Sequence, residues 1–256
     1  MATVTGNSAA GREQRFFLIM AWVMSLVIVA GFSLNLAMGR SSFDAPWQYH
    51  LHGVAFMGWI GLFLAQNTLI AGGNIALHKR LGQVAYFYIP LMVVLGFTIM
   101  FVSMRRTGGP FFFDQNEFLI SNSLQLLAFG GLAFASLRAR RYSGWHRRLM
   151  FGGMAILTGP GLGRLLPLPL MMPYAWRITI AATLIFPIIG MIADWRRSGK
   201  VHPAWLWGAG LILGAQILGS FIAYTSLGVS LTELLLAGSP GAERPMAAYL
   251  PPGFAM

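Results

Sequence analysis

The run FFLIMAWVMSLVIVAGFSLNLAM, residues 16–38, contains no charged side chain. At about 1.5 Å of rise per residue, a helix of this length spans roughly 35 Å, enough to cross the ~30 Å hydrocarbon core of a bilayer. Backbone groups find no water in lipid, so they must be satisfied within the segment, as they are in an α-helix. The run is also too long for the apolar part of a cleaved signal peptide. It therefore predicts a retained first transmembrane helix.

Further apolar segments follow, and the composition is that of a membrane protein. Of the 256 residues, 56% are hydrophobic and 10% are charged, whereas soluble domains carry about 25% charged residues. The later segments are residues 49–72, 81–104, 117–137, 149–165, 174–195 and 203–228. The fifth segment of the seven is the weakest, because Gly159, Pro160, Gly161 and Gly163 crowd its end. The sequence predicts an all-α fold, an integral membrane helical bundle of about seven transmembrane helices.

The regions on either side of this bundle, residues 16–228, have a different character. Residues 1–15 are small and polar and predict a disordered N-terminal tail. Residues 229–256 predict an interfacial segment followed by a tail rich in Pro and Gly.

Basic residues in alternate connections predict the orientation of the bundle, because cytoplasmic loops carry an excess of Lys and Arg. A cytoplasmic N-terminus places twelve basic residues inside: Arg12, Arg15, Lys79, Arg80, Arg138, Arg140, Arg141, Arg147, Arg148, Arg196, Arg197 and Lys200. The outer side then holds six: Arg40, Arg105, Arg106, Arg164, Arg177 and Arg244. We therefore expect the N-terminus in the cytoplasm and, with seven crossings, the C-terminus outside.

The sequence carries no enzyme signature, and no catalytic residue can be named from it. Cysteine is absent, which excludes disulfides, thiolate metal sites and cysteine nucleophiles. No Gly-x-Ser-x-Gly or His-Glu-x-x-His motif occurs. The net charge of +11 lies beside apolar runs, where it sets orientation, so we expect no nucleic-acid partner.

A scattered pattern of residues carries a family resemblance. It consists of His50-x-His52-Gly53, Trp59, Gln66 and His78-Lys-Arg-Leu-Gly, followed by His146-Arg-Arg-Leu-Met and Gly159-Pro-x-x-Gly-Arg164. The pattern resembles a group of uncharacterised proteobacterial multi-pass inner-membrane proteins, over roughly the second to fifth helices. The resemblance implies a bacterial inner membrane. That group has no known activity, so no residue role is carried over.

Histidine is the only good haem or transition-metal ligand left in the chain. His78 and His146 each open a His-basic-basic-Leu sequence at the start of a helix, and His202 opens the last helix from the same side. This echo predicts that His78 and His146 bind a b-type haem or another tetrapyrrole. Two alternatives are zinc held by all three histidines and a simple extension of the inner positive belt.

His50 and His52 lie at the outer end of the second helix. Positions i and i+2 of a helix point about 200° apart, so the two share a metal or cofactor only if the chain is extended there. The alternative is an interfacial pair whose polar tips reach water and headgroups.

A second set of polar residues falls inside the apolar segments: Gln66, Gln125, Gln216 and Arg164. They predict either a ligand cavity or interhelical hydrogen bonds between amides. Arg164 follows the Gly/Pro-rich stretch, where it marks an anion site or reaches the outer interface.

Two functions follow from these residues. The first is a cofactor-binding redox or accessory subunit of a membrane complex, and the alternative is a small-molecule permease or lipid-interacting protein. The expected partners are the lipid bilayer, anionic lipids at the inner face and other membrane subunits. Without haem or another tetrapyrrole, no cofactor is expected.

Overall fold

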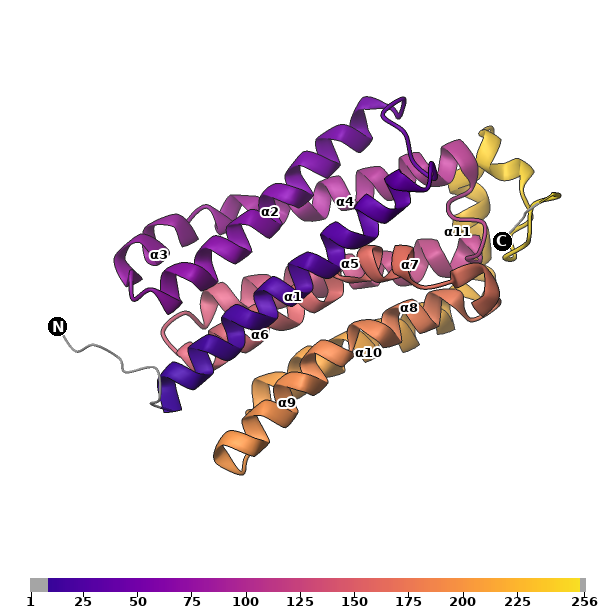
Figure 1. Ribbon diagram of the computed structural model, residues 1–256. Helices are drawn as coiled ribbons and strands as arrows, with labels where there is room; N and C mark the ends of the chain where they lie inside the picture. Colours follow the sequence, from indigo (N-terminus) through magenta and orange to yellow (C-terminus); the bar gives the residue numbers. More distant parts are fainter. Residues whose placement is uncertain (1–8, 254–256) are drawn as a thin grey trace.

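The computed structural model describes residues 9–253, which form helices joined by short connections (Figure 1). The α-helices are α1 (Ala9–Ala37), α2 (Trp47–Ala71), α3 (Ile75–Gly82), α4 (Ala85–Thr107), α5 (Gln115–Arg138), α6 (Ser143–Leu157), α7 (Gly159–Leu165), α8 (Ala175–Thr183), α9 (Ile185–Ser198), α10 (Pro203–Ala223) and α11 (Ser226–Leu236). Two 3₁₀ turns, η1 (Leu168–Met171) and η2 (Pro240–Glu243), complete the described part.

The long helices run side by side and form a bundle (Figure 1). We call the end at which α1 begins the N-terminal end and the opposite end, which holds α11, the C-terminal end. Helix α5 is central and packs against α4, α6 and α10, while α1 packs against α2 and α7. The core includes the fully buried side chains of Phe129, Phe151 and Trp205.

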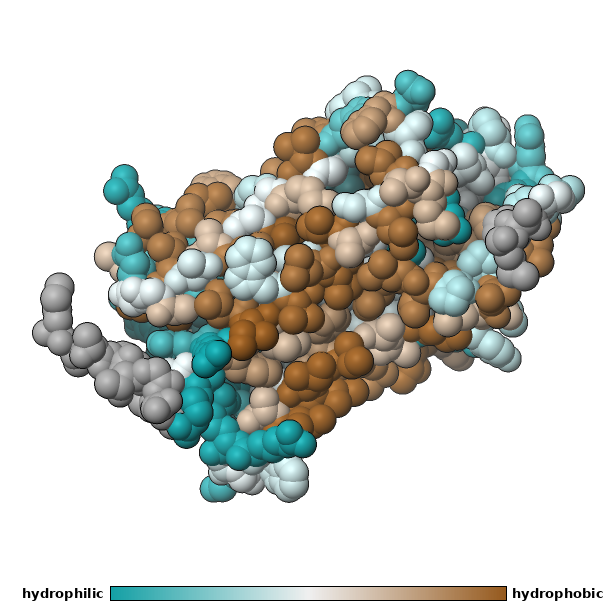
Figure 2. Space-filling view, viewed as in Figure 1, coloured by the Kyte–Doolittle hydropathy of each residue, from teal (hydrophilic) through white to brown (hydrophobic). Residues whose placement is uncertain are grey.

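The outer surface of the bundle is strongly apolar. Phe87, Phe221 and Trp207 are 84%, 72% and 67% exposed, and hydrophobic side chains cover the middle of the face seen in Figure 2. Hydrophilic side chains gather toward the two ends of that face, most densely beside the N-terminal end (Figure 2). An apolar middle between polar ends is the surface that a bilayer covers. The chain is a multi-pass helical membrane protein.

Six helical stretches of the described residues are long and apolar enough to cross a membrane: Gly11–Ala37, Trp47–Ala71, Ala85–Thr107, Gln115–Arg138, Ala175–Ser198 and Pro203–Ala223. The expected fifth segment is not one continuous helix. It consists of α6, with 15 residues, and α7, with 7 residues. Their helical rise gives about 22 Å and about 10 Å, so only the two together reach across a ~30 Å core.

Proline explains where the helices break. Pro160 follows the break between α6 and α7, and Pro187 follows the break at Leu184 between α8 and α9. Proline lacks an N–H group, and its ring collides with the carbonyl group four residues earlier, so a helix bends or stops just before it. Both crossings therefore bend without leaving the bundle.

Two glycines let α1 and α7 touch. A Cβ atom added to Gly31 would lie 2.3 Å from the carbonyl oxygen of Gly161, and one added to Gly161 would lie 2.7 Å from the Cα atom of Ile28. Such distances are shorter than any normal contact, so only glycine fits at this crossing. The two backbones hold the short helix α7 within the bundle, as small residues do at helix contacts in membranes.

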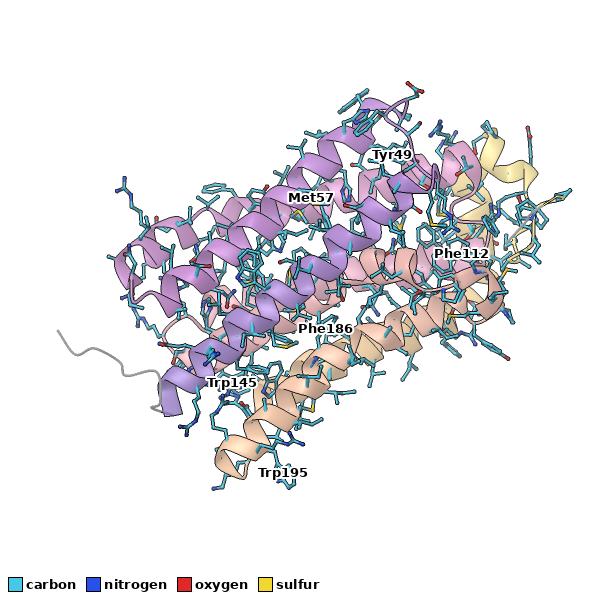
Figure 3. The ribbon with its side chains drawn as sticks, in the orientation of Figure 1. Tyr49, Met57, Phe112, Trp145, Phe186 and Trp195 are labelled. Atoms are coloured by element: carbon cyan, nitrogen blue, oxygen red, sulfur yellow. The ribbon has the colours of Figure 1, made fainter. Side chains whose placement is uncertain are left out.

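Aromatic side chains mark both ends. Trp145 and Trp195 lie toward the N-terminal end, whereas Tyr49 and Phe112 lie toward the C-terminal end (Figure 3). Tyr and Trp collect at membrane–water interfaces because one part of the ring is apolar and the other polar. Their positions agree with a bilayer whose two surfaces cross the bundle near its ends.

The two flanking segments are helical or docked over their described parts. Residues 1–8 of the expected N-terminal tail lie outside the described residues, and from Ala9 onward the chain is already in α1. After α11, Arg244 donates hydrogen bonds to the carbonyl oxygens of Gly108, Pro110 and Phe113 at 2.9, 3.0 and 2.7 Å. The Pro/Gly-rich segment is thereby bound across the end of α4.

Candidate functional site

The imidazole rings of His78 and His146 are neighbours at the N-terminal end of the bundle. His78 lies in α3 and His146 in the first turn of α6. Their ring centres are 6.2 Å apart, and the ring planes are inclined at 77°. The structure thus brings together the two histidines that the repeated His-basic-basic-Leu sequence pointed to.

Ser136 on α5 holds the His146 ring. The ring nitrogen Nδ1 lies 2.9 Å from the carbonyl oxygen of Ser136, and the Ser136 hydroxyl donates to the carbonyl oxygen of His146 at 2.7 Å. Because the hydroxyl hydrogen is used there, Nδ1–H donates to the Ser136 carbonyl. The lone pair of His146 is then on Nε2.

Gln66 on α2 holds the His78 ring. With its carboxamide turned to satisfy its neighbours, Gln66 donates to Nδ1 and to the carbonyl oxygen of His78, and it accepts from the Gly82 N–H at 2.9 Å. In this arrangement His78 carries its proton on Nε2. Both histidines therefore have Nδ1 engaged by a neighbouring helix, but in opposite tautomers, with the proton on Nδ1 of His146 and on Nε2 of His78.

Burial favours the neutral form of His78. Desolvation lowers the pKa of His78 below its ordinary value of 6.5, and the nearby His146 lowers this pKa further. A neutral imidazole is the form that binds a metal or accepts a hydrogen bond.

His202 has a separate role. Its Nδ1 accepts from the Ala204 N–H at 3.1 Å and so caps α10, while its ring packs edge-on against Trp145 at 5.4 Å. Burial lowers the pKa of His202, and Arg148 and Arg147 also lower it. Across residues 9–253, no three His, Asp or Glu side chains are grouped in a way that could hold a metal ion. The alternative of a three-histidine zinc site therefore has no support in the described residues.

His50 and His52 point apart, as their spacing on α2 requires. His50 is exposed, and its Nε2 lies 3.1 Å from the carbonyl oxygen of Ala45. His52 stacks on Phe56 at 5.7 Å, and its Nδ1 atom is buried without a hydrogen-bond partner among the described residues. Helix α2 begins at Trp47, so the extended chain needed for a shared ligand is not formed.

Arg164 in α7 lies near the C-terminal end. Its guanidinium carbon is 4.0 Å from the ring centre of Phe32 on α1, and Nη1 donates to the Pro160 carbonyl at 2.8 Å. Its Nε atom is buried with no hydrogen-bond partner in the described chain. Arg164 as a whole is only partly buried, but a buried Nε without a partner is unusual, because buried polar atoms are normally satisfied.

The three glutamines named from the sequence form separate contacts. Gln66 binds α3, as described above, at the N-terminal end. Gln125 on α5 donates to the Ile212 carbonyl of α10 at 2.9 Å, and Gln216 on α10 accepts from Ser121 of α5 at 2.9 Å. The structure does not bring Gln66, Gln125, Gln216 and Arg164 into one cavity; each amide joins two helices.

One buried polar network was not anticipated from the sequence. It surrounds Glu117 of α5, which is 1% exposed. Glu117 Oε1 accepts from the Arg177 Nε at 2.9 Å and from the Ser220 hydroxyl at 2.6 Å, and Oε2 accepts from the Tyr224 hydroxyl at 3.2 Å. Tyr224 shares its single hydroxyl hydrogen between this oxygen and Asp114 Oδ2, which lies at 2.5 Å, and burial raises the pKa of the Tyr224 phenol.

A spacing signal for this network does exist in the sequence. Glu117, Ser121 and Gln125 recur every four residues on α5, and the same spacing relates Gln216 and Ser220 on α10 to Tyr224, which directly follows that helix. Residues four apart lie on one face of a helix. Two polar stripes inside apolar helices predict that the stripes face each other.

A second unanticipated cluster lies at the N-terminal end. Arg147 and Arg148 of α6 and Arg197 of α9 surround the carboxylates of Glu13 and Asp194. The cluster joins α1, α6 and α9 through charges, and its positive charges outnumber its negative ones.

Comparison of the chain with protein-family models, with curated proteins and with solved structures gave no match in any of the three.

Proposed function

We propose that this multi-pass membrane protein binds a b-type haem, or another tetrapyrrole, between His78 and His146, as a redox or accessory subunit of a membrane complex. The proposal is carried by one observation: the two rings lie 6.2 Å apart, centre to centre, with Nδ1 of each held by a neighbouring helix.

The spacing of the rings supports this ligation. An imidazole nitrogen binds a metal at about 2 Å and lies about 1 Å from its own ring centre, so two imidazoles on opposite sides of one metal have centres about 6 Å apart. The 77° inclination of the two planes is compatible with axial ligands, because each imidazole can turn about its metal–nitrogen bond. A hydrogen bond to the distal nitrogen is also typical of metal-binding histidines.

Ligation of iron has a consequence for Gln66. His146 already has its lone pair on Nε2, whereas His78 must move its proton from Nε2 to Nδ1 before Nε2 can bind. Gln66 would then turn its carboxamide and offer the oxygen to Nδ1–H. That orientation would satisfy Nδ1–H, but it would break the bonds of the carboxamide to the His78 carbonyl and the Gly82 N–H.

The test is an absorption spectrum with metal analysis of detergent-purified protein from haem-replete cells. We expect a Soret band and a reduced-minus-oxidised difference spectrum that His78→Ala and His146→Ala each remove. His50→Ala is the matched control, since His50 is exposed and lies at the other end of the bundle. A monodisperse wild-type preparation that is colourless and metal-free would refute the proposal.

A second variant tests the proposal in case the histidine variants fold poorly. Gln66→Leu leaves both histidines in place and removes only the partner of His78 Nδ1. In the haem proposal this variant keeps the Soret band but shifts the reduction potential or weakens haem retention. An unchanged spectrum, potential and haem content would show that Gln66 does not serve a bound cofactor.

Exposed basic residues at the same end of the bundle support anionic lipids as partners at the inner face. Arg138, Arg141 and Arg196 are exposed there, in the connections that the sequence assigns to the cytoplasm. Each surface Lys or Arg attracts an anionic membrane by about 1 kcal/mol. Charge reversal at these three positions should weaken the preference of the protein for anionic over zwitterionic lipid.

A second candidate function is binding or passage of a small polar solute between α2 and α7. Two observations favour it: within residues 9–253, neither the Nε of Arg164 nor the Nδ1 of His52 has a hydrogen-bond partner. The solute would supply an acceptor to Arg164 and a hydrogen-bonding group to His52. If Arg164→Ala and His52→Leu leave all solute-induced changes in melting temperature as in the wild type, this candidate fails.

A further inference from the structure

A shallow groove lies at the C-terminal end, far from the histidine pair. It has a volume of about 430 Å³ and is bordered by the start of α2, the end of α4 and the turn after α11. Gln48, Arg105, Arg106 and Ser239 supply its polar groups, and Pro46 and Val102 supply apolar ones. No Asp or Glu is among the residues that line it.

The two arginines differ in how they are held. Arg105 Nη1 donates to the Leu235 carbonyl of α11 at 2.5 Å and lies 3.5 Å from the Ala237 carbonyl oxygen, which fixes its position. Arg106 forms no ion pair or hydrogen bond within residues 9–253, and its guanidinium carbon is 6.0 Å from the Tyr49 ring centre. The groove therefore presents one anchored and one available guanidinium group without a compensating carboxylate.

Gln48 provides an independent sign of a ligand. Its Oε1 atom is buried and has no hydrogen-bond partner among the described residues. A carboxamide can turn to present its NH₂ group instead, so Gln48 can donate to an acceptor in the groove. A buried polar atom left unsatisfied costs about 1–3 kcal/mol, and a bound group would remove that cost.

The surroundings identify the kind of ligand. Phe43, in the segment before α2, and Trp47, the first residue of α2, are 76% and 67% exposed, and Trp47 stands between Pro46 and Gln48 in the chain. Exposed aromatic side chains at the end of a span mark the headgroup level of a bilayer. Pro46, which supplies part of the apolar lining of the groove, directly precedes Trp47.

We propose that the groove binds the anionic phosphate headgroup of a membrane lipid, with Arg106 and Arg105 on the phosphate oxygens, Gln48 as a further donor and the acyl chains along the lipid-facing surface. The arginine fork matches the oxygens of a phosphate group. This site is independent of the haem proposal, and it lies at the opposite end from the basic residues of the inner face.

The first test uses the full chain in nanodiscs that contain phosphatidylglycerol with a photoactivatable headgroup. We expect crosslinks to peptides that contain Val102 or Ser239. Arg106→Gln should lower this crosslinking about tenfold, the change expected when one charge-assisted contact worth roughly 1.4 kcal/mol is lost. Gln48→Leu should lower it as well.

Arg40→Gln is the matched control, since Arg40 is an exposed arginine in the connection before α2 at the same end. An equal loss in Arg40→Gln and Arg106→Gln would mean general charge attraction and would overturn the site. Equal crosslinking by photoactivatable phosphatidylcholine, or none at Val102 and Ser239, would do the same.

A second arm separates a lipid from a free anion. Lipid-depleted protein in detergent is titrated with inorganic phosphate and, separately, with short-chain phosphatidylglycerol while its melting temperature is followed. The lipid should raise the melting temperature of the wild type more than that of Arg106→Gln, and phosphate should leave both unchanged. Stabilisation by phosphate alone would show that the groove takes a free anion and would overturn the lipid assignment.

Discussion

Arg148 on α6 and Asp194 on α9 form a two-point ion pair inside the N-terminal end of the bundle. Nε donates to Oδ2 at 2.8 Å and Nη2 donates to Oδ1 at 2.7 Å, and the two side chains are 6% and 3% exposed. The indole N–H of Trp205 on α10 also donates to Oδ2 at 2.8 Å, and Arg148 reaches Glu13 on α1 at 2.7 Å. Four helices thus share one buried set of charges.

Removal of Arg148 should be one of the most damaging single changes at this end. Arg148→Ala leaves the Asp194 carboxylate without its main partner, and loss of one member of a buried pair costs about 3–5 kcal/mol. We expect a large fall in the unfolding free energy in detergent, measured by denaturant titration. Arg141→Ala, which removes an exposed arginine of the preceding connection, should change it by less than about 0.5 kcal/mol. Similar unfolding free energies for the two variants would contradict the conclusion that the buried Arg148 ion pair stabilises the bundle.

The Glu117 network gives a second prediction. Glu117→Gln keeps the shape of the side chain and removes its charge, whereas Glu117→Leu removes the polar atoms as well. Glu117→Leu removes the acceptor used by Ser220 and Gln216 and leaves buried donors unsatisfied, at a cost of about 2–3 kcal/mol. Glu117→Gln keeps an acceptor oxygen and should cost about 1 kcal/mol. Thermal unfolding of both variants checks this order. Equal losses would mean that the carboxylate charge alone matters.

The helical bundle was predictable because hydropathy reports which segments are in lipid. Residues 49–72 were expected to be a helix, and α2 is Trp47–Ala71. The last segment was expected to continue to residue 228, but α10 ends at Ala223. The reason is local: the Thr225 side chain accepts from the Gly228 N–H at 3.4 Å and so begins α11, as N-cap residues do.

The candidate site was predictable in part. The repeated His-basic-basic-Leu sequence pointed to His78 and His146, and their ring centres lie 6.2 Å apart. The partners of Glu117 and Asp194 were not predicted, because both carboxylates lie near the ends of apolar segments. Hydropathy averages over several turns and does not report which side of a terminal turn faces the protein. The four-residue spacing of polar residues on α5 and α10 carries that information.

The stability of the fold should depend on pH through His78. The folded-state pKa of His78 is lowered below 6.5, chiefly by burial, so below pH 6.5 the unfolded chain takes up a proton that the folded chain takes up less readily. Stability from this residue is therefore complete above about pH 7 and is lost as pH falls through the lowered pKa. We expect the melting temperature to fall less steeply between about pH 7 and pH 5.5 in His78→Gln than in the wild type. His50→Gln, the same substitution at an exposed position, is the control variant. A wild-type slope in His78→Gln would contradict the burial of this ring.

The crossing of α1 and α7 supplies the last prediction. A methyl group at position 161 would lie 2.7 Å from the Cα atom of Ile28 and 3.0 Å from the carbonyl oxygen of Val27. Both are backbone atoms and cannot turn away as a side chain can. Gly161→Ala must therefore push α7 from α1, at a cost of about 1–3 kcal/mol.

Gly210→Ala is the matched control, because a methyl group there meets no atom within 4 Å and the helix gains stability when glycine becomes alanine. We expect Gly161→Ala to lower the melting temperature and Gly210→Ala to hold or raise it. The displacement of α7 should also move Arg164 away from Phe32, which directly follows Gly31 on α1, so Gly161→Ala should raise the reactivity of Arg164 toward an arginine-modifying reagent. Unchanged melting and reactivity in Gly161→Ala would show that α1 and α7 are not in backbone contact.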